Sequence, residues 1–213
     1  MSPAPLIVLT GGPGGGKSRL TEELQHDAAW SGRVAALPEA IFIMQGMGVS
    51  SRERRFQRLM VHLQMSLEEG LQRGLGPAGG RVVLCHRGSL DPLAYWLDRG
   101  WPEEEFFAFT KTRREEHLRR YAAVIHLVTA ADGAVAHYAR WPEAHRPEQA
   151  EDAVRLDHRL HRVWRDHPRY CRVGNEGRDW AAKSQAARRI LAEVTADLAA
   201  RTPGFGEGSD ARR

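Results

Sequence analysis

The fold of this chain is decided by one glycine-rich stretch, Gly11-Gly12-Pro13-Gly14-Gly15-Gly16-Lys17-Ser18. The stretch fits the phosphate-binding pattern G-x-x-x-x-G-K-[ST] at every fixed position. A short apolar run at 6–9 precedes it, as in a buried parallel strand, and Leu20 and Leu24 follow it with the i, i+4 spacing of a helix. The sequence therefore predicts a strand, a glycine loop and a helix in the order that a phosphate-binding loop requires.

Such a loop is built to hold an anion. Glycines permit positive φ angles, and successive N–H groups then point into one concavity that faces the positive end of the next helix. Lys17 is expected to reach the β- and γ-phosphates of a nucleoside triphosphate, and the Ser18 hydroxyl to ligate Mg²⁺. The predicted cofactor-binding residues here are Gly12, Pro13, Gly14, Gly15, Gly16, Lys17, Ser18 and Arg19. The alternative is a glycine-rich turn with a solvated lysine.

The length and the charge of the chain bear on its domain organisation and on the kind of ligand it binds. The 213 residues fit one nucleotide-binding domain, predicted at 1–201, with a small lid at about 131–147. The tail at 202–213 is rich in glycine and polar residues without periodicity, so we expect it to be disordered. A net charge of +4, from 31 basic and 27 acidic residues, suits a protein that handles phosphates and does not by itself indicate nucleic-acid binding.

The sequence also bears on the cellular compartment. No apolar run approaches membrane-spanning length and no N-terminal segment resembles a signal peptide, so a cytoplasmic protein without a membrane partner is expected. Cys85 and Cys171 lie in short apolar contexts. We therefore expect both to be reduced residues of the core and not parts of a disulfide framework.

Strands alternate with helices along the chain. Further strands are predicted at 33–37, 81–85, 123–128 and 170–173, and helices at 51–73, 91–98, 103–120, 148–166 and 180–200. This alternation predicts an α/β fold, a three-layer α/β/α sandwich with a mainly parallel sheet. Ligands of such sheets bind beyond the carboxyl ends of the strands, which would bring Glu39, the segment 86–91 and Asn175 close to the glycine loop.

Three side chains after the second and third of these strands are candidates for chemistry. Glu39 can hold a Mg²⁺-bound water or accept a proton from a substrate hydroxyl, or it can be an acid favoured by a helix dipole. Arg87 can bind a phosphate or form a salt bridge to Asp91, four residues on. Asp91 can act as a base or in a metal shell, or it can cap the helix that contains Pro92.

Three more candidates lie in the second half of the chain. Arg140 and Arg146 fall in the predicted lid, where an arginine can neutralise charge on the γ-phosphate or simply be solvated. Asn175 follows the last strand, where its amide can contact the adenine or guanine edge or form a turn beside a glycine. Lys183 is expected on a helix surface.

Several segments resemble the small AAA-type ATP/GTP-binding proteins, namely LTGGPGGGKS, LPEA, FQRLMVHLQ, CHRGSLDPLAYW, HRPEQAEDAVRLDHRLHRVW and VGNEGRDWAAK. These proteins are related to the ribosylnicotinamide kinase domain of NAD-regulator proteins and to the nucleotide-binding domain of a GTP-binding photoreceptor-trafficking family. The similarity runs from about Leu6 to Leu198 and implies the P-loop fold of nucleoside and nucleotide kinases.

One residue departs from that family's pattern. The family usually has an Asp before Arg-Gly, an acid that would hold the Mg²⁺ shell or act as base, and this chain has His86 there. A neutral imidazole is a poor ligand for Mg²⁺, which prefers oxygen donors. Either Asp91 or Glu39 takes over, or the catalytic step is impaired.

The leading hypothesis is a protein that binds Mg²⁺ with ATP or GTP and transfers the γ-phosphoryl group to a small hydroxylated acceptor. Ser18 would hold Mg²⁺, helped by Glu39 through a water. The predicted catalytic residues are Lys17, Glu39, Arg87, Asp91 and Arg140. The alternative, which His86 favours, is a nucleotide-dependent switch or slow NTPase that acts through a protein partner. A nucleic-acid binder has only the basic charge in its support.

Overall fold

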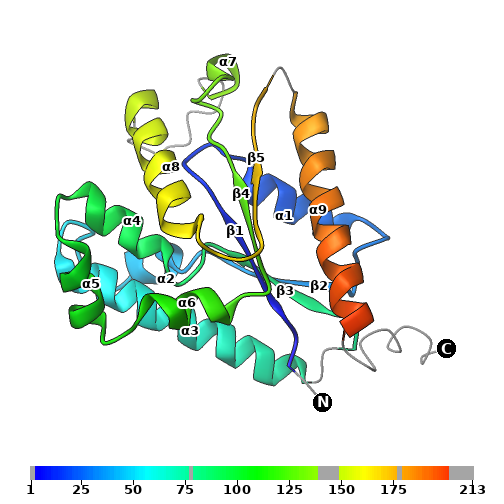
Figure 1. Cartoon of the computed structure of the whole chain (residues 1–213), viewed down its shortest axis with the longest axis horizontal. Helices are drawn as coiled ribbons and strands as arrows, with labels where there is room; N and C mark the ends of the chain where they lie inside the picture. The colour runs from blue at the N-terminus through cyan, green and yellow to red at the C-terminus, as the bar shows by residue number, and fades with distance from the viewer. Residues whose placement is uncertain (1–2, 77–78, 139–148, 177–178, 202–213) are drawn as a thin grey trace.

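The computed structural model describes residues 3–76, 79–138, 149–176 and 179–201. Its centre is a sheet of five parallel strands in the order β2-β3-β1-β4-β5 (Figure 1). The strands are β1 (Leu6–Thr10), β2 (Val34–Leu37), β3 (Val82–His86), β4 (Ala123–Leu127) and β5 (Tyr170–Val173). The predicted α/β fold with a mainly parallel sheet is confirmed.

Helices connect the strands in the alternation that the sequence predicts. They are α1 (Lys17–His26), α2 (Ile41–Gln45), α3 (Arg54–Leu75), α4 (Asp91–Asp98), α5 (Glu103–Thr110), α6 (Arg114–Arg120), α7 (Val135–Tyr138), α8 (Ala150–Trp164) and α9 (Trp180–Arg201). Among the described residues, no helix is long and apolar enough to cross a membrane.

The prediction of a single helix at 103–120 is wrong, because the chain forms two helices there. Lys111 has a φ of 56°, in the left-handed region, which ends α5. The hydroxyl of Thr110 hydrogen-bonds to that of Thr112 at 2.7 Å and fixes the turn. The charged residues around this break carried no glycine or proline signal that would have marked it.

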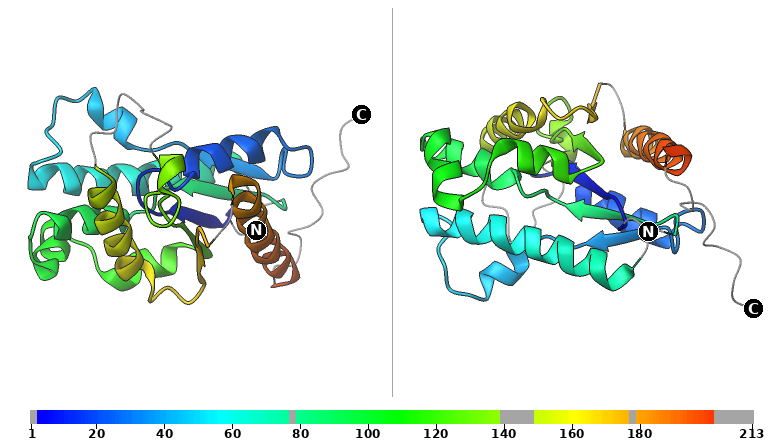
Figure 2. Two further views of the ribbon diagram at one scale, coloured as in Figure 1. Left: turned by 90° about the horizontal axis from the view of Figure 1, so that it is seen from above. Right: turned by 60° about the horizontal axis from the view of Figure 1, so that its bottom comes forward.

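The helices cover both faces of the sheet because successive strand residues point to opposite sides. Ile7 and Leu9 pack with Leu20 of α1 and with apolar residues of α9 on one face. Val8 and Val83 pack on the other face with apolar residues of α3, α4 and α8. In both views of Figure 2, α9 stays apart from α8 and α5, as expected for the two outer layers.

All five strands run in the same direction, so their carboxyl ends meet at one edge. The glycine loop leaves β1 at this edge, and the segment with Glu39 leaves β2. His86 is the last residue of β3 and pairs in register with Leu9 of β1. The fold therefore brings the predicted site residues of the first half of the chain to one place.

Candidate nucleotide-binding site

The loop at 11–18 adopts a conformation that needs its glycines. Gly11, Gly14 and Gly16 have φ angles of 121°, 73° and 91°. A Cβ atom on Gly11 would lie 2.0 Å from the carbonyl oxygen of Leu127, and one on Gly16 would lie 2.1 Å from the ring of Trp180. Helix α1 starts at Lys17 without a side-chain cap on its first amides. These amides are thus placed as an anion seat requires.

Lys17 lies along the loop. Its side chain is buried, and Nζ donates hydrogen bonds to the carbonyl oxygens of Gly11 at 2.8 Å and Gly12 at 3.0 Å. The alternative of a solvated lysine is therefore wrong. An ammonium group held within the loop can transfer to phosphate oxygens by a change of side-chain rotamer, because its three donors rotate freely.

Ser18, His86 and Glu39 form a short chain of contacts beside the loop. The Ser18 hydroxyl lies 3.0 Å from His86 Nε2, and His86 Nδ1 lies 3.5 Å from Glu39 Oε2. Burial lowers the pKa of His86 to about 3 against the attraction of Glu39, so the imidazole is neutral near pH 7. Burial acts to raise the pKa of Glu39, but the charges of Arg87 and Lys17 and the hydrogen bond from Arg87 outweigh it and lower that pKa to about 2.

Arg87 joins the glycine loop to Glu39. Its Nη1 donates to the Gly11 carbonyl at 2.9 Å, and its Nε donates to Glu39 Oε1 at 3.0 Å. Its φ of 85° is rare for a residue with a side chain, and Gln64 Nε2 holds the Arg87 carbonyl at 3.0 Å. The partner of Arg87 is thus Glu39 and not Asp91, which the i, i+4 spacing had suggested.

Asp91 is buried and fully engaged. Its carboxylate accepts hydrogen bonds from the Thr10 hydroxyl at 2.8 Å, the Gly88 amide at 3.2 Å and the Trp164 indole at 2.6 Å. Asp91 is the first residue of α4, whose N-cap is Leu90, so the predicted cap role is wrong. The carboxylate ties β1, α4 and α8 together, and its predicted role as a base or in a metal shell stays untested.

Asp157 braces the loop and is not among the site residues predicted from the sequence. Its Oδ1 accepts hydrogen bonds from the amides of Gly12 at 2.6 Å and Thr129 at 3.1 Å, and its Oδ2 lies 3.0 Å from His126 Nε2. Its pKa is lowered because these hydrogen bonds outweigh burial, which acts to raise it. A signal was present, since Asp157 follows Leu156 and precedes Leu160 on the apolar stripe of α8, where a charged residue needs partners.

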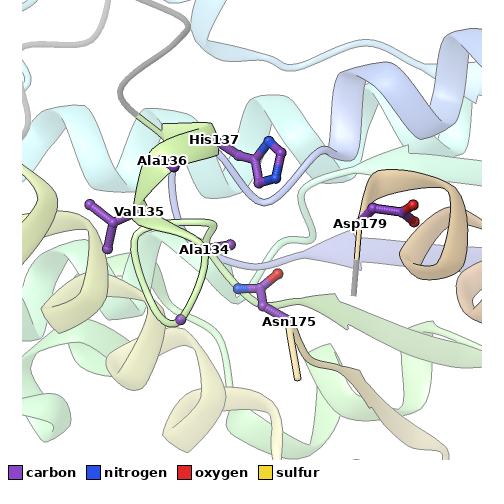
Figure 3. Close-up of a pocket in the computed structure, with 7 residues that line it drawn as sticks. Ala134, Val135, Ala136, His137, Asn175 and Asp179 are labelled. Carbon is purple, nitrogen blue, oxygen red and sulfur yellow. The ribbon is translucent and has the colours of Figure 1, made fainter. Parts of the chain in front are cut away.

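A pocket of about 450 Å³ lies between the segment after β4 and the connection from β5 to α9. Figure 3 shows His137, Asn175 and Asp179 around its opening. The remaining lining residues are those of the segment 133–136. The pocket is shallow and open to solvent, and its position matches the edge where ligands of parallel sheets bind.

Asn175 lines this pocket, but its side chain is bound to the protein. Nδ2 donates to the carbonyl oxygens of Thr129 and Asp132, both at 2.6 Å, and Oδ1 accepts from Lys183 Nζ at 2.8 Å. Both amide hydrogens are thus used, and the predicted contact to a base could come only from the remaining lone pair of Oδ1. The expected surface position of Lys183 is wrong, because its side chain is buried and also donates to the Val128 carbonyl.

The predicted lid is only partly within the described residues. Its first part contains α7, and the ring of Tyr138 lies close to Gly14, since a Cβ on that glycine would come within 2.7 Å of it. Arg140 and Arg146 lie outside the described residues, as does the tail at 202–213, so the predictions about them stand untested.

The donor set fits a divalent cation only in part. P-loop folds generally bind nucleotide together with Mg²⁺, and Ser18 offers one hydroxyl oxygen. The position expected for a carboxylate oxygen holds an imidazole, in contact with Ser18. Within the described ranges, no group of three His, Cys, Asp or Glu residues could hold a metal ion by itself.

The sheet order and the glycine loop define a P-loop α/β fold like that of nucleoside and nucleotide kinases. A family model described as an AAA domain matches residues 6–199, so the chain belongs to that AAA domain family. The predicted kinship with P-loop nucleotide-binding proteins is confirmed.

A solved structure of deoxyadenosine kinase from M. mycoides, with the products dCMP and a flexible dCDP bound, is similar to this chain. The TM-score is 0.59, and the alignment covers 88% of this chain and 99% of that one at 14% identity. At this identity the likeness concerns the fold. A search among curated proteins found no match.

Proposed function

We propose that this protein binds a nucleoside triphosphate at the loop 11–18 and transfers its γ-phosphoryl group to the hydroxyl of a small acceptor. The observation that carries the proposal is the contact of one carboxylate, Glu39, with Arg87 at 3.0 Å beside a loop whose lysine is buried. A cationic phosphate seat with an oriented carboxylate next to it is what phosphoryl transfer needs, because the rate depends on positioning and charge neutralisation.

The roles of the residues follow from their chemistry. Loop amides and Lys17 bind the β- and γ-phosphates, with Lys17 exchanging its two carbonyl partners for phosphate oxygens. Arg87 keeps Glu39 ionised and fixed, and its guanidinium can also bind a phosphate oxygen. Ser18 holds the cation that accompanies the triphosphate, whose charge helps to neutralise the phosphates.

Glu39 orients the acceptor in the proposed reaction. The acceptor oxygen forms a bond to the γ-phosphorus, the bond from phosphorus to the bridging β,γ-oxygen breaks, and the nucleoside diphosphate leaves. The acceptor proton passes to Glu39 late in the reaction, because a carboxylate with a pKa of about 2 is a weak base and the loose transition state demands little base strength.

The nucleobase is assigned to the pocket beside His137 and Asp179. Its position at the sheet edge, between two loops, supports this assignment. Whether ATP or GTP is preferred depends on contacts of this pocket, for which Asn175 has only one acceptor position left.

A test combines binding and turnover. The purified protein is titrated with ATP and GTP in a calorimeter, and release of nucleoside diphosphate is followed with a panel of nucleosides and small alcohols. Acceptor-dependent release that disappears in Lys17→Ala is the expected result. The matched control is Arg119→Ala, which removes a cation from the exposed surface of α6.

The second candidate, a switch or slow NTPase that acts through a protein partner, is favoured by His86 in place of the usual acid. Tight nucleotide binding without turnover for any acceptor would support this candidate and contradict phosphotransfer. If neither nucleotide binds, both candidate functions are contradicted.

A further inference from the structure

One imidazole, that of His86, lies where the cation of a bound nucleotide is expected. His86 ends β3, the strand beside β1, and its ring lies next to the first turn of α1. Its Nε2 is 3.0 Å from the Ser18 hydroxyl oxygen, the atom expected to hold the cation of the bound nucleotide. A nitrogen donor and an oxygen donor are therefore side by side where the cation is expected.

The spacing of these two donors suits one ion between them. Neighbouring ligands of a six-coordinate ion with bonds of about 2.1 Å subtend a right angle and lie about 3.0 Å apart. Ser18 Oγ and His86 Nε2 have this separation. Without the ion, the same separation accommodates a hydrogen bond from the Ser18 hydroxyl to Nε2.

The other side of the imidazole favours Nε2 as the donor to a metal. Nδ1 is buried without a hydrogen-bond partner, and the nearest carboxylate oxygen is Glu39 Oε2 at 3.5 Å. A proton on Nδ1 facing this carboxylate leaves the lone pair on Nε2. A carboxylate behind a metal-binding histidine is the usual means by which proteins orient the ring and raise its basicity.

The carboxylates expected to replace the missing acid are engaged elsewhere. Asp91 accepts three hydrogen bonds in the interior, and Glu39 Oε1 accepts one from Arg87. Moving Asp91 toward the cation would leave the indole of Trp164 and the amide of Gly88 buried without a hydrogen-bond acceptor, which is unfavourable. His86 is thus the donor best placed beside Ser18.

We infer that His86 Nε2 and Ser18 Oγ together bind the cation of the nucleotide complex, and that this site prefers a first-row transition ion such as Mn²⁺ or Co²⁺ to Mg²⁺. This inference rests on the proposed nucleotide binding. Mg²⁺ takes oxygen ligands, whereas imidazole nitrogen suits the later divalent ions, whose affinities rise from Mn²⁺ to Co²⁺. The phosphate oxygens complete the coordination, so the ion binds with the nucleotide and not to the free protein.

The direct test is spectroscopic and needs no substitution. The protein is mixed with Mn²⁺ and a non-hydrolysable ATP analogue, and pulsed electron paramagnetic resonance records nitrogen couplings to the ion. A directly bound ¹⁴N is expected, and growth with ¹⁵N-histidine should shift its frequencies. The absence of histidine nitrogen coupling, with the analogue bound, overturns the inference and assigns the 3.0 Å contact to a hydrogen bond.

Calorimetry gives the second measurement. In the wild type, the analogue is expected to bind about tenfold more tightly with Mn²⁺ than with Mg²⁺, and at least as tightly with Co²⁺. His86→Asp should abolish this preference, while His62→Asp, on the exposed face of α3, should keep it. Equal affinities with Mg²⁺ and Mn²⁺ in the wild type contradict the inference and leave the proposed function standing. Failure of the analogue to bind with any of the three ions contradicts the proposed function itself.

Discussion

The carboxylate of Asp157 accepts a hydrogen bond of 2.6 Å from the backbone amide of Gly12, although 145 residues separate the two in the chain. The same carboxylate binds the Thr129 amide and His126. The shape of the glycine loop therefore depends on α8 and on the segment after β4, and not only on its own glycines.

Replacing Asp157 by Ala should destabilise the protein by about 3 kcal/mol, because two buried amides and a buried imidazole lose their partner. Urea unfolding followed by circular dichroism measures the change. Asp152→Ala removes an exposed carboxylate from the same helix and should cost less than about 0.5 kcal/mol. Similar losses in the two variants would show that the bond to Gly12 contributes little.

Lys17→Ala should weaken the binding of ATP by at least about 30-fold, since it removes a desolvated cation from the phosphate seat. The far-ultraviolet circular dichroism spectrum should remain that of the wild type. Titration calorimetry supplies the affinity, with Arg119→Ala as the control for a lost positive charge. Unchanged affinity in Lys17→Ala would rule out the phosphate role of this lysine.

Gly16→Ala should lower the free energy of unfolding by about 3 kcal/mol or more. The alanine would have to adopt a left-handed backbone conformation, and its methyl group would collide with the Trp180 ring. Gly32 has a φ of 75° but open space around it. Gly32→Ala should therefore lower the free energy of unfolding only by the cost of the left-handed backbone, about 1 kcal/mol. Thermal and urea unfolding of both variants measure the difference. Equal costs would mean that Trp180 moves aside without loss.

The buried Lys183 should make the free energy of unfolding depend on pH in the alkaline range. Burial lowers its pKa from 10.5 to about 8. Between these two values the native state has released a proton that the unfolded state still binds, so the free energy of unfolding should rise with pH, by up to about 3 kcal/mol.

Urea unfolding of Lys183→Met from pH 7 to pH 10.5 tests this expectation. In this variant the free energy of unfolding should lack the increase with pH that Lys183 causes in the wild type. Other titrating groups contribute equally to both proteins. Lys111→Met removes an exposed lysine and should follow the wild-type curve. Parallel curves for the wild type and Lys183→Met would show that Lys183 keeps its ordinary acidity.

His86→Asp should raise phosphoryl transfer with Mg²⁺ by about tenfold, because it places an oxygen donor and a negative charge beside Ser18. Initial rates of acceptor-dependent diphosphate release measure the effect at saturating nucleotide. An unchanged rate would mean that another residue already supplies the oxygen donor.

Much of the fold could be predicted because its signals are local. A short apolar run marks each central strand, and the glycine loop needs only its own eight residues to be recognised. The placement of Glu39 and Arg87 beside this loop also followed, because the carboxyl ends of parallel strands must meet at one edge.

The partners of single side chains could not be predicted in this way. Lys183 lies on a helix with a long apolar face, and its burial depends on how α9 is rotated against β4 and β5. The i, i+4 spacing suggested a pair of Arg87 with Asp91, but the positive φ of Arg87 turns its side chain toward Glu39. That backbone angle is held by Gln64 of α3.

The sequence by itself determined the glycine loop, the alternation of strands and helices and the edge of the sheet at which the candidate site lies. Only the tertiary structure decided that Asp157 braces the loop, that the amide of Asn175 turns inward and that His86 touches Ser18. The reason is physical: periodicity fixes which face of an element is buried, whereas hydrogen bonds between distant elements depend on their relative rotation and depth, which the packing of the whole core sets.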